Sequence, residues 1–171
     1  MQSKLIVCDV ESDGPCPGMY SMISFGAVVV EEGLNRTFYG LCKPIADVWI
    51  PEALAVSGHT REETLQFPHA SITIKKFKDW LDSLSIRPIF ISDNPAFDWQ
   101  FINYYFHTSL NVNPFGFSAR RIGDLYAGMQ KNMHVKWKHL RQTKHSHHPV
   151  DDAKGNAEAL LKMGKMGLVG I

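Results

Sequence analysis

Acidic side chains at three places in the chain have the type and spacing needed to bind divalent cations. Asp9 and Glu11 end the apolar run at residues 5–8, which predicts a buried strand. Because strand side chains alternate between two faces, we expect Asp9 and Glu11 to point the same way. Crowded carboxylates at the end of a buried strand repel each other and lose hydration, and a hard divalent cation relieves both costs. The pair therefore predicts a metal site, with two solvated strand-end acids as the alternative.

Two further acids, Asp98 and Asp152, each follow a proline that opens a predicted helix, at Pro95 and Pro149. A carboxylate in the first turn is stabilised by the helix dipole whatever its function, so neither position alone indicates a site. Periodicity separates the two acids of the last helix. Asp151 falls on the charged, solvated face, whereas Asp152 borders the apolar stripe. We therefore expect Asp152 to turn inward and meet the strand carboxylates.

A histidine lies five residues before Asp152, just ahead of the last helix. His147 is one of five histidines in this part of the chain, so only its spacing from Asp152 singles it out. We expect it to lie on a segment mobile enough to reach a water beside a metal. The alternative is a histidine-rich zinc site, but the chain has no cysteine partners at the usual spacings. The other four histidines are His134, His139, His145 and His148.

Taken in order, these residues resemble the DEDD exonucleases of the histidine subclass, also called DnaQ-like exonucleases, of the ribonuclease H-like superfamily. That family has Asp-x-Glu in the first strand, Asn-x-x-x-Asp on a later helix and His-x-x-x-x-Asp-Ala at the start of the last helix. The corresponding residues here are 9–11, 94–98 and 147–153. A fourth segment, 50–63 (IPEALAVSGHTREE), resembles the stretch that follows the third strand in these enzymes.

The resemblance implies a metal-dependent 3′-5′ exonuclease that acts on single-stranded DNA or RNA and releases nucleoside 5′-monophosphates. It implies two Mg²⁺ or Mn²⁺ ions, with Asp9 bridging them and Glu11 and Asp152 completing the tighter site. Asp98 binds an ion or positions the attacking water, and His147 is the general base. Carboxylate ligands favour these ions over Zn²⁺. A catalytically inactive nucleic-acid-binding or polymerase-associated module is the alternative, although all four carboxylates are present.

The resemblance also places the terminal nucleotide against the loop after the first strand and against the helix that follows the third. The substrate-binding residues implied in this way are Ser12, Gly14, Glu52, Val56 and Ser57. Many members have histidine where Ser57 stands, and Pro149 replaces a small residue inside the histidine motif.

The chain has 171 residues and 44% hydrophobic content, enough for one core, and we expect a single exonuclease domain spanning residues 1–171. The expected fold class is α/β, a ribonuclease H-like mixed sheet in which an antiparallel three-strand meander is joined by parallel strands and flanked by helices. A fifth strand follows from the resemblance but cannot be located in the sequence. The expected strands are 4–11, 22–30, 37–43 and 88–92, and the expected helices begin near 51, 74, 95, 123 and 149.

The net charge is only +1, but its distribution is uneven. Residues 119–148, which we call the basic segment, hold seven Lys or Arg and one acid, so the rest of the chain is net negative. A cationic strip beside a carboxylate site suits an enzyme that cleaves a polyanion, and a solvated basic loop is the alternative. Tyr126 and Trp137 within the segment could stack on bases or belong to the core.

The expected partner is a single-stranded nucleic acid with a free 3′ end, and DNA and RNA remain equal alternatives. A homodimer or an association with a polymerase is left open. Three cysteines without metal-type spacing favour a reducing, cytoplasmic location. We expect no signal peptide and no membrane association, because the first apolar run has only four residues and no segment reaches membrane-spanning length.

Overall fold

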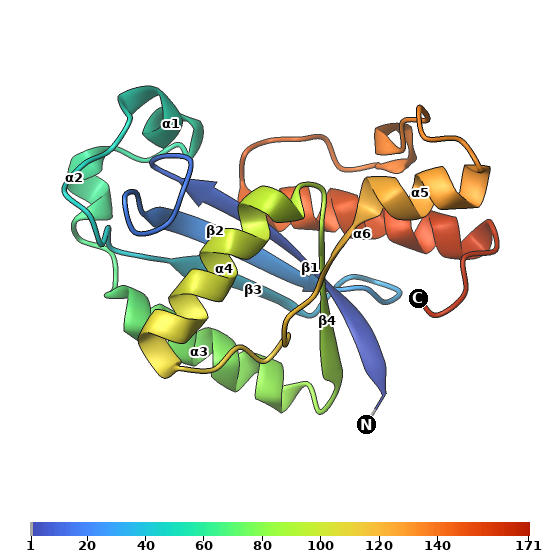
Figure 1. Ribbon diagram of the computed structural model, residues 1–171, viewed down its shortest axis with the longest axis horizontal. Coiled ribbons are helices and arrows are strands. Elements are labelled where there is room, and N and C mark those ends of the chain that lie inside the picture. The colour runs from blue at the N-terminus through green and yellow to red at the C-terminus, as the bar shows by residue number, and fades with distance from the viewer. Residues whose placement is uncertain (1) are drawn as a thin grey trace.

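A five-stranded mixed sheet forms the centre of the protein in the computed structural model, which describes residues 2–171 (Figure 1). The strand order is β3-β2-β1-β4-β5. The first three strands pair antiparallel, and β4 and β5 continue the sheet in parallel from β1. The predicted ribonuclease H-like mixed sheet is thereby confirmed. The strands are β1 (Ser3–Ser12), β2 (Met22–Val29), β3 (Thr37–Leu41), β4 (Arg87–Ser92) and β5 (Ala119–Arg121).

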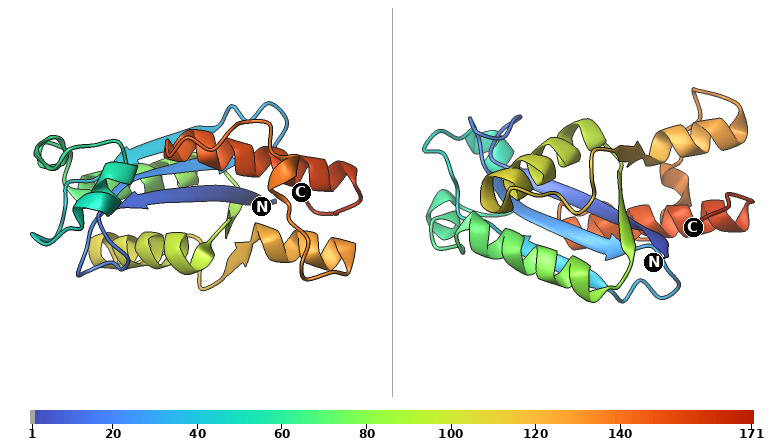
Figure 2. Two further views of the ribbon diagram at one scale, coloured as in Figure 1. Left: turned by 90° about the horizontal axis from the view of Figure 1, so that it is seen from above. Right: turned by 60° about the horizontal axis from the view of Figure 1, so that its bottom comes forward.

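Helices cover both faces of the sheet (Figures 1 and 2). One core lies between the sheet and α3 (Ala70–Ser83) with α4 (Pro95–Leu110), and a second lies between the sheet and α5 (Ile122–Gln130) with α6 (Pro149–Lys165). Two short helices, α1 (Pro51–Val56) and α2 (Arg61–Thr64), follow β3, and a 3₁₀ turn at Lys138–Leu140 precedes α6.

The central strand β1 divides its side chains between the two cores. Ile6, Cys8 and Val10 belong to the core with α3 and α4, whereas Leu5 and Val7 belong to the core with α6. Because side chains alternate along a strand, Asp9 and Glu11 lie on the α6 face. Their shared direction therefore places both carboxylates on the side from which the last helix approaches.

Gly26 of β2 allows the start of α6 to approach the sheet closely. It is paired with Asp9 across the β1–β2 ladder. A Cβ atom added to Gly26 would lie 2.4 Å from the carbonyl carbon of Pro149, far inside van der Waals contact. The first turn of α6 thus rests on the backbone of β2 directly beside Asp9.

Several elements were not predicted from the sequence. Strand β5 lies inside the basic segment, and α2 and the 3₁₀ turn were also missed. The sequence of β5, Ala-Arg-Arg, has no alternating apolar pattern, and its pairing with β4 defines it as a strand. Helix α3 begins at Ala70, four residues before the predicted start, after His69 accepts a hydrogen bond from the Ser71 amide.

We predict that Gly26→Ala lowers the free energy of unfolding by about 1–3 kcal/mol, the usual cost of overpacking. The matched control is Gly128→Ala in α5, where the added Cβ meets no atom within 4 Å. The control should gain about 0.5–1 kcal/mol, because alanine favours a helix interior. Urea denaturation measures both, and equal stability of the two variants would contradict a close approach at Gly26.

Candidate active site

Three of the predicted carboxylates converge where β1 ends and α6 begins. One carboxylate oxygen from each of Asp9, Glu11 and Asp152 lies within 4.8 Å of the other two. Asp9 and Glu11 reach this point from β1, and Asp152 reaches it from the first turn of α6. Asp152 is fully buried, as its place beside the apolar stripe predicted, whereas the side chain of Asp151 is 49% exposed.

Asp98 approaches the same strand from α4, on the opposite side of the sheet. Strand β4 pairs with β1 only as far as Val7, so the amide of Val10 lies beyond the last paired residue. The Val10 N–H donates to Asp98 Oδ1 at 3.1 Å. Asp98 therefore completes the hydrogen bonding of β1 at the point where the ladder stops. Asn94 precedes α4 as predicted, but its side chain makes no capping hydrogen bond.

Crowding makes these carboxylates hard to ionise together. Burial, followed by the neighbouring charges of Asp98, Glu11 and Asp152, raises the pKa of Asp9 well above its ordinary value. Burial and the charges of Asp152 and Asp98 raise the pKa of Glu11 to about 8. Burial also raises the pKa of Asp98 to about 7. The group thus holds protons in the absence of a cation, and a divalent cation would stabilise its ionised form.

Asp152 differs because donors surround it. Its Oδ1 accepts from Arg141 at 2.9 Å and from the Ser146 amide at 3.1 Å, and its Oδ2 accepts from the His147 amide at 2.9 Å. His145 Nδ1 lies 2.8 Å from Oδ1. Although burial alone raises its pKa, these donors outweigh burial and lower the pKa of Asp152 below the ordinary value. Asp152 is therefore the fixed negative charge of the site.

Arg141, which as one of the seven cations of the basic segment was expected to bind the polyanion, is instead a structural residue of the site. Its side chain is only 9% exposed and forms an ion pair with Asp152. The guanidinium occupies space left by Gly155, because a Cβ there would lie 2.5 Å from Arg141 Nε. The aromatic residues of the basic segment belong to the core, which was one of the two alternatives for them. Tyr126 and Trp137 are buried on the side of the sheet that α6 covers.

A hydrogen bond to Asp152 anchors the backbone of His147. Its φ of 60° lies in the left-handed region, and its amide is bonded to Asp152. The ring remains half exposed, with Nδ1 3.8 Å from Glu11 Oε1. His148 turns away from the carboxylates, and its ring lies 5.0 Å from that of Tyr39. His147 is therefore the histidine that faces the site from the predicted position.

His145 is a site residue that the sequence analysis did not select. Its ring meets that of His147 edge to face at 4.2 Å, and together with Asp152 the two form a second group of closely spaced ligand atoms. Its spacing of seven residues from Asp152 matches no part of the family pattern, so no signal in the sequence distinguished it from its neighbours.

A mostly apolar pocket of about 380 Å³ opens beside Glu11, between the end of β1 and helix α1. We call it the terminal pocket. Of the five predicted substrate-binding residues, Ser12, Gly14 and Val56 line it. Glu52 is exposed outside the lining, and the Ser57 hydroxyl is directed to the Leu54 carbonyl at 2.7 Å. The sequence analysis did not select the other lining residues, Pro15, Ile50, Ala53 and Phe97.

Comparison with known proteins identifies the family. A search against family models finds no match. Cap18, a 3′-5′ DNA exonuclease of Escherichia coli, is 35% identical over 172 residues, which cover 92% of this chain and 90% of Cap18. This chain belongs to the DnaQ-like 3′-5′ exonuclease family. The predicted family and enzyme class are thus confirmed.

Solved exonuclease structures share the fold at low sequence identity. Cell-death related nuclease 4 superposes with a TM-score of 0.77 at 16% identity, covering 97% of this chain and 65% of that nuclease. A 3′-exonuclease that recognises a histone mRNA stem-loop gives 0.77 at 18%, covering 96% and 82%. The zinc-bound complex of E. coli exonuclease I with single-stranded DNA gives 0.71 at 18% and covers 97% of this chain, which spans 41% of exonuclease I. Within residues 2–171, no helix combines the length and apolar character needed to cross a membrane.

We predict that the metal-free exonuclease becomes less stable as the pH rises from about 5 to 8.5. The folded pKa of Glu11, about 8, exceeds the ordinary value of 4.5, so its contribution is complete below pH 4.5 and is lost as the pH rises through 8. Asp98 acts in the same direction through about pH 7. Melting temperatures in EDTA measure the loss, and added Mn²⁺ should reverse it because bound cations favour ionised carboxylates.

Glu11→Gln should remove part of this pH dependence, whereas the control Glu62→Gln, on the exposed face of α2, should leave it unchanged. A wild-type melting temperature that does not vary over this range in EDTA would contradict the raised pKa values.

We predict that Arg141→Gln lowers the free energy of unfolding by about 3 kcal/mol, because removing one partner leaves a buried charge uncompensated. The control Lys144→Gln changes an exposed cation of the same segment and should stay within about 0.5 kcal/mol. Denaturant titration measures both. An Arg141→Gln protein with normal stability but weaker oligonucleotide binding would restore the phosphate-binding assignment.

Proposed function

We propose that this exonuclease removes nucleotides one at a time from the 3′ end of single-stranded DNA or RNA and releases nucleoside 5′-monophosphates. The observation that carries the proposal is the convergence of Asp9, Glu11 and Asp152 within 4.8 Å, beside a half-exposed His147. The similarity to Cap18 supports DNA as a substrate. The fold shared with a histone mRNA 3′-exonuclease keeps RNA in the proposal.

The donor set fits two Mg²⁺ or Mn²⁺ ions. Its ligands are carboxylate oxygens. The pKa values of Asp9 and Glu11 are raised in part by repulsion between neighbouring carboxylates, which cations would relieve. Asp9, Glu11, Asp152 and Asp98 would hold the ions. Two such ions supply charge neutralisation at the scissile phosphate and at the leaving oxygen.

The protein's own groups would perform the remaining steps. The terminal pocket holds the last nucleotide, so that its 5′ phosphate lies beside Glu11. His147 accepts a proton from the attacking water, whose oxygen bonds to phosphorus as the bond to the preceding O3′ breaks. The terminal nucleotide leaves with the phosphate, and the O3′ of the shortened strand takes up a proton from solvent water and becomes its new 3′ hydroxyl. The Asp152 network fixes the backbone of His147 and thereby its ring.

We predict that single changes of Asp9, Glu11, Asp98 or Asp152 to Ala abolish hydrolysis in a folded protein. Asp151→Ala is the matched control, because it changes the adjacent, half-exposed carboxylate, and it should remain active. Matched 5′- and 3′-labelled DNA and RNA oligonucleotides with Mn²⁺ provide the measurement. A ladder of 5′-labelled products that shortens by one nucleotide supports the proposal. Activity in the Asp152 variant beside an inactive Asp151 variant would contradict it.

We predict that His147→Ala lowers kcat by about 10²- to 10⁴-fold, the usual contribution of a general base. Mn²⁺ binding, measured by calorimetry, should persist because the ligands are carboxylates. His148→Ala, which changes the ring packed on Tyr39, should keep its turnover. The reverse pattern in the two variants would exchange their roles.

A further inference from the structure

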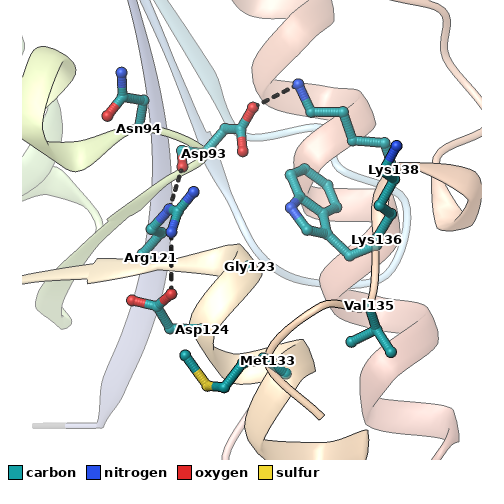
Figure 3. A pocket seen from close by; sticks show the side chains of 11 residues that line it. Asp93, Asn94, Arg121, Gly123, Asp124, Met133, Val135, Lys136 and Lys138 are labelled. Carbon is teal, nitrogen blue, oxygen red and sulfur yellow. Dashed lines mark hydrogen bonds and ion pairs between the residues drawn. The ribbon is translucent and has the colours of Figure 1, made fainter.

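A second pocket is lined by Asn94, the residue before α4, whereas Phe97 of α4 lines the terminal pocket. The second pocket has a volume of about 670 Å³ and is formed by the residues after β4, the start of α5 and the segment 133–138 (Figure 3). We call it the α5 pocket. Its size falls within the range of small-molecule and nucleotide sites. The catalytic proposal above does not use it.

The charges of the α5 pocket leave one cation free. Arg121 pairs with Asp124 at 3.2 Å, and Lys138 pairs with Asp93 at 2.8 Å. Figure 3 shows both pairs as dashed lines. Lys136 is exposed and has no ion-pair partner among residues 2–171. The two acids are therefore neutralised, and the pocket presents a net positive charge to a ligand.

Apolar and rigid walls accompany this charge. Met133 is 79% exposed and lines the pocket with Val135 and Ala127. Trp137 is buried beneath them, and its indole nitrogen lies 3.4 Å from the position of a Cβ on Gly123. A free cation beside an apolar wall matches the two parts of a nucleotide, an anionic phosphate and a flat base.

The α5 pocket is close to the carboxylates. The last residue pair of the β1–β4 register is Val7 with Ile91, and Asp9 and Asp93 each follow this pair by two residues. Because β1 and β4 are adjacent strands of the sheet, the pocket wall that follows β4 lies next to the end of β1. Asp93 also contributes to the raised pKa of Asp98. The terminal pocket begins at Glu11, at the end of β1, so the two pockets flank the carboxylates.

We propose that the α5 pocket binds the single strand on the 5′ side of the scissile bond, with a phosphodiester against Lys136 and a base against Met133 and Val135. This inference rests on the proposed exonuclease function. The terminal nucleotide occupies the terminal pocket, the bond to be cleaved lies at the carboxylates, and the strand continues into the α5 pocket. Lys136, and not Arg121 or Lys138, is the phosphate ligand because the other two cations are engaged.

Binding to the whole protein tests the proposal, with Ca²⁺ replacing Mn²⁺ to prevent cleavage. Lys136→Glu should weaken binding of a hexanucleotide by about tenfold, reduce the slope of log affinity against log salt by about 1, and change dinucleotide binding less than about twofold. The control Lys76→Glu makes the same charge change on the exposed surface of α3 and should affect neither ligand. A hexanucleotide affinity that is equal in the two variants overturns the proposal.

Photocrosslinking locates the strand independently. An oligonucleotide with 5-iodouracil at the second or third position from the 3′ end should crosslink to residues 133–138, and one with it at the terminal position should crosslink near the terminal pocket. Crosslinks of the inner positions elsewhere overturn the proposal. The proposal is also overturned if Lys136→Glu weakens the binding of free deoxyadenosine monophosphate as strongly as it weakens the binding of the hexanucleotide. If wild type releases no nucleotides with Mn²⁺ while crosslinks still map to 133–138, the proposed function fails and the binding site stands.

Discussion

Repulsion among buried carboxylates is the constraint on which the site depends. Two acids on one face of β1, a third from α6 and a fourth from α4 occupy a small volume with little access to water. Protonation and cation binding are the two ways to relieve their repulsion. Asp152 alone is held ionised by donors, and it is therefore the charge around which a cation site can assemble. Carboxylates reach the site from β1, α4 and α6, and the segment before α6 supplies the donors that stabilise Asp152.

Two glycines make this assembly possible by lacking side chains. Gly26 lets the first turn of α6 rest on β2, which brings Asp152 to the level of Asp9. Gly155, one turn further along α6, leaves room for the Arg141 guanidinium beside Asp152. Both the close approach of α6 to the sheet and the position of Arg141 against α6 thus depend on glycines, which have no side chain. A domain with the same carboxylates but bulkier residues at these positions could not bring them together.

The proposed substrate surface consists of two pockets with different chemistry. On one side of the carboxylates the terminal pocket is mostly apolar and suits one base and sugar. On the other side the α5 pocket combines a free cation with apolar walls, as a continuing strand requires. Ion pairs determine which cations of the basic segment are free to bind a phosphate, because Arg141 and Lys138 are already paired with acids. Within the described residues 2–171, three of the seven cations of the basic segment are therefore engaged in ion pairs, and of these only the pair of Arg141 is buried.

The sequence by itself determined the strand meander and the order of the main elements, because these follow from local periodicity, and the resemblance to the exonuclease family singled out the four carboxylates. Alternation along β1 gave the common direction of Asp9 and Glu11, and the helical period separated Asp152 from Asp151. Only the tertiary structure decided what depends on partners distant in sequence. Strand β5 is defined by its pairing with β4. Arg141 forms an ion pair with Asp152 and occupies the space that Gly155 leaves free. Trp137 is buried by neighbours that no local pattern reveals. Local periodicity determines which face of an element is apolar, whereas the neighbour that packs against this face is determined only when the chain folds.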